Sequence, residues 1–155
     1  MTLKIKKESL AQIKAFGEAA YPSECCGFLL GKISNDFRQV MTLLPATNEF
    51  KEEEKHHRFL MTPRAYLQAE KTARAEALDI IGFYHSHPDA DAKPSAYDLE
   101  HGWPWYSYVI ISIRERHVRE ITSWILQDSR DGFDQEDLII DSRNPHAIKE
   151  DANDS

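Results

Sequence analysis

The stretch FYHSHPDADAKPSAYD, residues 83–98, combines side chains that bind metal ions with side chains that exchange protons. His85 and His87 stand one residue apart at the end of an apolar run, and Asp98 follows eleven residues after His87. Alternate side chains of a β-strand point to the same face, so the two imidazoles would converge on one point. Two imidazole nitrogens and one carboxylate oxygen suit a catalytic zinc ion, with a fourth position left for water. The pattern therefore predicts a zinc site held by His85, His87 and Asp98.

Each part of this pattern also has an ordinary explanation. A His-x-His pair by itself is weak evidence for a metal, because most histidines are surface residues or packed core residues. Ser95 and Asp98 stand at the spacing of a capping box, which would start a helix without any chemistry. An imidazole pair, the strand-ending Pro88 and a helix-opening carboxylate occur together here, and this combination favours the metal site.

A metal-activated water needs a carboxylate that takes its proton and passes it to the leaving group. Glu24 is a candidate because it stands directly before the apolar run CCGFLLG, where it would be held close to the predicted site. The alternative is an exposed acid at the start of a strand.

Cys25 and Cys26 allow a second kind of chemistry, a cysteine nucleophile with a histidine base. The alternative is that both are small apolar residues of the core, although Cys26 shares the face of Glu24 and could line the site. Adjacent cysteines are a poor disulfide pair, and the absence of a disulfide framework favours a reducing cytosol.

The composition excludes several classes of partner. A net charge of −7 argues against binding to nucleic acid and to anionic membrane surfaces. No apolar run approaches the length of a membrane span, and the N-terminus has no continuous apolar segment of a secretory signal. We therefore expect a cytoplasmic protein that binds neither nucleic acid nor membranes.

The periodicity and the turn signals predict a single domain over residues 1–142 and a polar tail over 143–155. The predicted helices cover 7–20, a segment that begins at Pro63 after the cap residue Thr62, and a short segment that ends at Gly102. The predicted strands cover 25–33, 37–45, 78–86, 106–113, 118–126 and an edge strand at 137–140, with an exposed loop at 48–59. This order indicates an α/β fold, an α+β sandwich in which helices flank a mixed central sheet.

The segment GWPWYSY, residues 102–108, is unusually aromatic. It would either pack at the rim of the core or form a wall for an extended peptide tail.

The segments SECCGFLLG, GFYHSHPDADAKPSAYD and YSYVIISI resemble the JAMM (MPN+) metallopeptidases over about residues 5–126. That family has a glutamate, then His-Ser-His-Pro, then Ser-x-x-Asp, and every one of these positions is present. The resemblance implies the MPN architecture, which is similar to that of cytidine deaminases. It also implies that His85, His87 and Asp98 bind zinc. Glu24 matches the general acid/base, and Ser95 matches the hydroxyl that stabilises the oxyanion.

The short chain is most similar to the compact prokaryotic members, which include desampylases and peptidases that process sulfur carrier proteins. The resemblance therefore implies a zinc peptidase or isopeptidase that cuts after the C-terminal glycines of a ubiquitin-fold protein. Scaffold members of the family lose the metal ligands, whereas this chain keeps them, which favours an enzyme. The alternatives are an MPN-like module that binds ubiquitin-fold partners without cleaving them, and a cysteine-dependent hydrolase.

Overall fold

The structure is a computed structural model that describes residues 1–48 and 61–141. The predicted tail and nearly all of the predicted loop at 48–59 lie outside these residues. The helices are α1 (Lys7–Ala20), α2 (Pro63–Ala75) and α3 (Ala96–His101). The strands are β1 (Thr2–Lys6), β2 (Cys26–Ile33), β3 (Phe37–Ala46), β4 (Asp79–Pro88), β5 (Ser107–Arg114), β6 (His117–Leu126) and β7 (Phe133–Asp141).

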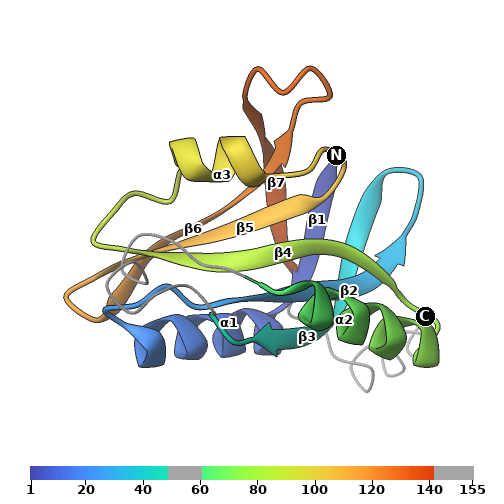
Figure 1. Ribbon diagram of the computed structural model, residues 1–155, viewed down its shortest axis with the longest axis horizontal. Helices are drawn as coiled ribbons and strands as arrows, with labels where there is room; N and C mark the ends of the chain where they lie inside the picture. The colour runs from blue at the N-terminus through green and yellow to red at the C-terminus, as the bar shows by residue number, and fades with distance from the viewer. Residues whose placement is uncertain (49–60, 142–155) are drawn as a thin grey trace, which may run out of the picture.

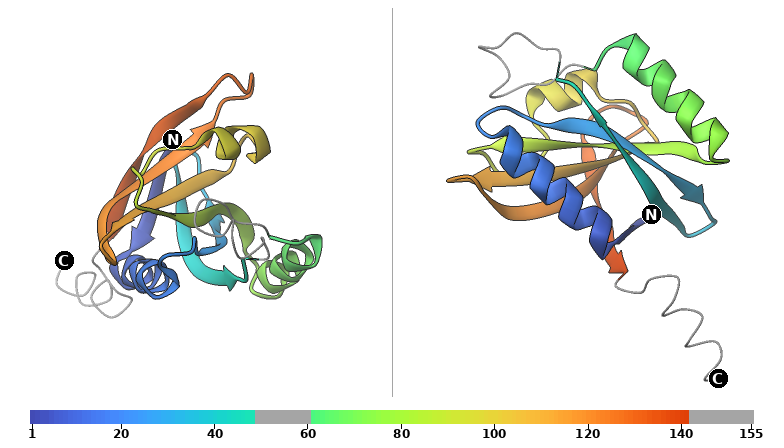
Figure 2. Two further views of the ribbon diagram at one scale, coloured as in Figure 1. Left: turned by 60° about the vertical axis from the view of Figure 1, so that its left-hand side comes forward. Right: turned by 90° about the horizontal axis from the view of Figure 1, so that it is seen from below.

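The strands close into a barrel in the order β1-β3-β2-β4-β5-β6-β7 (Figures 1 and 2). The closing element is β1, which pairs in parallel with β3 on one side and with β7 on the other. This strand was not predicted, because the TLKIK run is short and its pairing depends on these distant partners. A strand forms at residues 137–140 as predicted, but it is part of the longer β7, which is not a sheet edge because residues 133–136 pair with β6 and residues 137–141 pair with β1.

The predicted helices form where their signals indicated. Thr62 caps α2 by accepting a hydrogen bond from the Ala65 amide, and Pro63 occupies the first turn, where its missing N–H costs nothing. Ala69 and Ala73 of α2 are buried against β2 and β4. Ala77 lies beyond the end of the helix and has a positive φ.

A β-bulge in β4 changes which side chains of this strand point into each of two apolar cores. Leu29 of β2 pairs with Gly82 and Leu30 pairs with Ile80, so Ile81 is an extra residue in β4. Regular alternation would put Ile81 and Phe83 on one face. Instead, Ile81 packs into the core that contacts α1, and Phe83 packs into the aromatic core beneath α2. The bulge therefore determines which face receives the side chains that follow Phe83.

The prediction of a mixed sheet is confirmed, because β4 and β5 are parallel while β2, β3 and β4 are antiparallel neighbours. The predicted sandwich, a central sheet flanked by helices, is not confirmed, since the strands close on themselves. In the view of Figure 1, α1 and α2 lie below β4 and α3 lies above it, and α1 and α2 pack against opposite faces of β4. Over residues 1–48 and 61–141, no helix has the length and apolar character needed to cross a membrane.

Candidate metal centre

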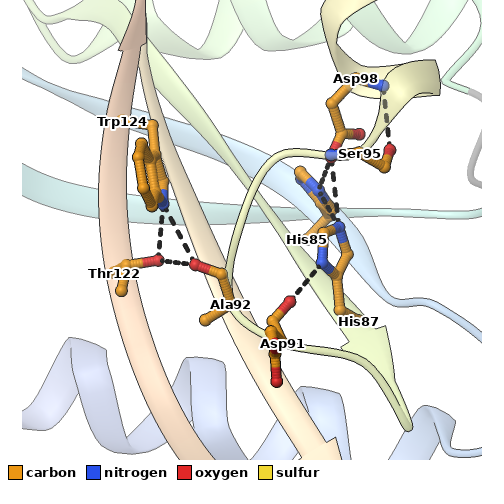
Figure 3. Close-up of polar contacts among 8 residues, drawn as sticks. All are labelled: His85, His87, Asp91, Ala92, Ser95, Asp98, Thr122 and Trp124. Atoms are coloured by element: carbon orange, nitrogen blue, oxygen red, sulfur yellow. Dashed lines mark hydrogen bonds and ion pairs between the residues drawn. The ribbon is translucent and has the colours of Figure 1, made fainter. Parts of the chain in front are cut away.

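Three donor atoms from β4 and α3 meet at one point (Figure 3). The Nε2 atoms of His85 and His87 lie 3.1 Å apart, and Oδ2 of Asp98 lies 3.3 Å from the first and 3.2 Å from the second. A tetrahedral zinc ion with bonds of about 2.0–2.1 Å has ligand atoms about 3.3–3.4 Å apart. The three atoms thus have the separations and the chemical types that zinc requires, and the predicted residues do come together.

The capping box at the start of α3 orients Asp98. Oγ of Ser95 accepts a hydrogen bond from the Asp98 amide at 3.0 Å, and the Ser95 amide donates to Oδ2 of Asp98 at 2.8 Å. The same carboxylate oxygen therefore caps the helix and faces both imidazoles. The capping-box explanation of Ser-x-x-Asp is confirmed, and the cap also fixes the carboxylate in the position that a metal ligand would need.

A carbonyl in the loop after β4 fixes the ring of His87. Nδ1 of His87 lies 2.9 Å from the carbonyl oxygen of Asp91, so Nδ1 carries the proton and Nε2 presents its lone pair to the other two donors. The loop is itself anchored to β6, where Thr122 Oγ1 and Trp124 Nε1 donate to the Ala92 carbonyl at 2.6 and 3.3 Å (Figure 3). Sequence analysis missed Thr122 and Trp124, because nothing in an ordinary strand pattern marks a residue that supports a distant loop.

Burial and neighbouring groups set the charges of Asp98 and His85. Burial alone raises the pKa of Asp98, but the neighbouring imidazoles of His85 and His87 outweigh it and hold the pKa well below its usual range. Complete burial lowers the pKa of His85, although Asp98 opposes that shift. The site at neutral pH therefore contains an ionised carboxylate and a neutral His85 imidazole, the protonation states in which these side chains bind metals.

Glu24 lies beside this group and is buried. One of its carboxylate oxygens lies within 4.8 Å of a ring nitrogen of each histidine. The backbone next to it is held to β4, since the Cys25 amide donates to Ser86 Oγ at 2.8 Å and the Ser86 amide donates to the Cys25 carbonyl at 3.1 Å. Burial, together with the nearby Asp98 carboxylate, raises the pKa of Glu24 to about 9. Without a nearby cation this carboxyl holds a proton at neutral pH, and a zinc ion bound beside it would favour the ionised form.

The two thiols are poorly suited to act as nucleophiles, because their pKa values are raised. Burial raises the pKa of Cys25 to about 11 and that of Cys26 to about 12. A cysteine nucleophile acts as the thiolate, whose pKa must be lowered toward neutrality. Cys26 lies opposite His85 in the β2–β4 pair, and its Sγ is directed toward the Ala46 carbonyl at 3.8 Å. Cys26 is thus a small buried residue, and Cys25 is a partly buried one that packs against the core.

Arg130, in the turn between β6 and β7, binds the end of α3. Its guanidinium donates to the carbonyls of Gly102 at 2.9 Å, Leu99 at 3.2 Å and Glu100 at 3.2 Å. A helix of six residues has little stability of its own, so these three bonds contribute to the position of Asp98. No motif marks Arg130, and sequence analysis did not find it.

Replacing Arg130 with glycine tests this support. Arg130 has φ 65°, a conformation that glycine adopts freely, so Arg130→Gly should leave the turn and the thermal midpoint close to those of the wild type. Loss of the bonds to α3 should speed hydrogen exchange of the Leu99 and Gly102 amides about tenfold or more. The matched control is Arg116→Gly, since Arg116 has φ 68° in another turn. Equal exchange of the α3 amides in both variants would show that Arg130 does not hold the helix.

Comparison with known proteins identifies the family. Residues 6–127 match the family described as prokaryotic homologs of the JAB domain. The chain belongs to this family. The matched residues include Glu24, His85, His87 and the Ser95–Asp98 segment. The match confirms the resemblance that the spaced motif indicated.

Two curated relatives of this JAB-domain chain are named desampylase. The one from Haloferax volcanii is 36% identical over 92 residues, which cover 59% of this chain and 63% of the relative. The one from Pyrococcus furiosus is 32% identical over 105 residues, which cover 68% of each chain. The chain therefore spans less than two thirds of the length of the Haloferax volcanii relative.

Solved structures show the same fold. A protein from Desulfitobacterium hafniense is 31% identical with a TM-score of 0.81, over 93% of this chain and 96% of that chain. A JAB1/MPN domain protein from Archaeoglobus fulgidus has a TM-score of 0.55 at 19% identity, over 90% of this chain and 97% of that chain. The barrel described above is thus the JAB/MPN fold.

Proposed function

We propose that this JAB-domain protein is a zinc-dependent peptidase or isopeptidase that cuts after the C-terminal glycines of a ubiquitin-fold protein. The observation that carries the proposal is the convergence of the His85, His87 and Asp98 donor atoms within 3.1–3.3 Å, with Glu24 beside them. Two relatives named desampylase support a substrate that carries a small protein modifier. The same chemistry would serve a sulfur carrier that bears a C-terminal extension, and we expect the reaction in the cytoplasm.

The family resemblance implies a role for each residue of the site, and the geometry is compatible with these roles. His85, His87 and Asp98 would hold the zinc, which when bound supplies an activated water and polarises the scissile carbonyl. Glu24 would take the proton of the water on its carboxylate and deliver it to the departing amine nitrogen. Oγ of Ser95 already accepts from the Asp98 amide, so its own O–H is left to donate to the developing oxyanion.

Cleavage of a fusion protein tests the proposal. Ubiquitin-fold proteins that carry a short peptide after their terminal Gly-Gly should lose this peptide when incubated with the zinc-loaded protein, as mass spectrometry of the intact C-termini would show. A chelator such as 1,10-phenanthroline should abolish the reaction and added zinc should restore it, whereas iodoacetamide should at most weaken it, because Cys25 and Cys26 are protonated. Partners that bind tightly yet stay intact across a broad panel would instead support the non-catalytic binding module.

A further inference from the structure

An aromatic cavity opens directly beside the candidate metal centre. Its volume is about 220 Å³, and Asp98 forms part of its wall. The rest of the wall is mainly aromatic and comes from β2, α2, β4, α3 and β5 with the loop before it: Phe28, Tyr66, Phe83, Tyr97, Trp103 and Tyr108. A group that occupies the cavity would therefore contact a residue of the proposed zinc site.

The walls of the cavity are held in place before any ligand binds. Phe83 packs against Phe28 and Tyr108 with ring centroids 5.6 and 5.4 Å apart. The Trp103 amide donates to the Tyr108 hydroxyl at 2.8 Å, and the Trp103 ring lies 5.9 Å from that of Tyr66. A wall that is already rigid loses little conformational entropy when a side chain enters it.

The chemistry of the cavity favours an apolar occupant. Among the described residues that line it, none is a lysine or an arginine, so it offers no counter-charge to an acidic group. Trp103 lies at the rim of the cavity, where 54% of it remains exposed. An exposed tryptophan beside a buried aromatic pocket is a typical anchor for an apolar side chain.

The position of Glu24 indicates which part of a substrate enters the cavity. In the proposed reaction Glu24 delivers its proton to the leaving amine, so the leaving group lies near Glu24. Asp98 lines the cavity and Glu24 does not, which directs the other half of the substrate, the tail before the scissile bond, toward the cavity. Two terminal glycines have no side chains and span about 7 Å when extended, so the preceding residues are the first that could fill it.

We infer, on the basis of the proposed peptidase function, that this cavity is the specificity pocket for the tail of the substrate. It binds an apolar side chain from one of the two residues that precede the terminal glycines. Substrates would then be ubiquitin-fold proteins with an apolar residue at one of these positions, and tails with only polar residues there would be poor substrates.

Binding of two short peptides to the zinc-loaded protein tests the inference without cleavage. The probes are acetyl-Leu-Leu-Gly-Gly and acetyl-Ser-Ser-Gly-Gly, which carry the same charge and end in the same glycines. Burial of one leucine side chain should make the leucine peptide bind about 10- to 100-fold more tightly in a calorimetric titration. Trp103→Ala should remove most of this preference. The matched control Trp105→Ala should keep it, since Trp105 belongs to the same loop and is 45% exposed but does not line the cavity.

Equal affinity for the two peptides, or no measurable binding of either at millimolar concentration, would overturn the inference. A preference for leucine that survives in Trp103→Ala would also overturn it, because the apolar side chain would then bind elsewhere. These results are distinct from failure of the proposed function. Preference for the leucine peptide without cleavage of any fusion protein would support the pocket and contradict the peptidase function. Cleavage without this preference would support the peptidase function and contradict the pocket.

Discussion

Glu24→Gln is expected to abolish most of the turnover while the fold and the zinc content stay unchanged. Glutamine has the size of glutamate and keeps a hydrogen-bonding carbonyl, but it cannot accept or deliver the proton. General acid/base catalysis contributes on the order of 10²- to 10⁴-fold, so kcat for cleavage of a Gly-Gly fusion protein should fall by at least this range. Rates measured by mass spectrometry, with metal analysis and thermal unfolding of the same samples, would check the prediction.

A second buried acid gives the control for this experiment. Glu136 on β7 is buried and accepts a hydrogen bond from Ser123 Oγ at 2.7 Å, away from the candidate site, so Glu136→Gln should retain turnover. Ser95→Ala should show a milder loss than Glu24→Gln, about 10²- to 10³-fold, as expected for one oxyanion donor. Turnover of Glu24→Gln within threefold of the wild type, at normal zinc content, would exclude Glu24 as the proton carrier.

His87→Ala and Asp98→Asn are each expected to lose most of the bound zinc and, with it, the activity. The wild-type protein should hold about one zinc per chain after dialysis, because three donor atoms lie 3.1–3.3 Å from one another. Removing one of three protein ligands leaves too few donors for tight binding. Asp98→Asn is the sharper of the two variants, since the amide oxygen can still accept from the Ser95 amide and preserve the cap of α3.

His101→Ala is the control for the histidine variant. His101 lies at the end of α3, with its side chain 55% exposed, and is not one of the three converging donors. Its replacement should leave the zinc content at the wild-type value. Equal zinc in the wild type, His87→Ala and Asp98→Asn by elemental analysis would contradict the ligand assignment, whatever the activity of these variants.

The sequence determined the features of this protein that depend on short-range chemistry. The spacing of His85 and His87 puts both side chains on one face of any strand, and Ser95 with Asp98 forms a cap in any helix that starts there. Thr62 and Pro63 likewise start α2 through interactions within a single turn. These signals were sufficient for α2, for α3 and for the candidate metal ligands, because each needs only a few neighbouring residues to operate.

Only the tertiary structure decided how these parts meet. The bulge at Ile81 directs Phe83, and the alternate residues His85 and His87 after it, to the aromatic side of the sheet, and it arises from the pairing of β4 with β2. Closure of the barrel depends on β1 finding β3 and β7, and the position of α3 depends on Arg130 some thirty residues away. Such contacts join segments that are far apart in the chain, and their free energy comes from burial and from bonds that form only when the whole barrel is assembled. No local pattern of residues encodes them.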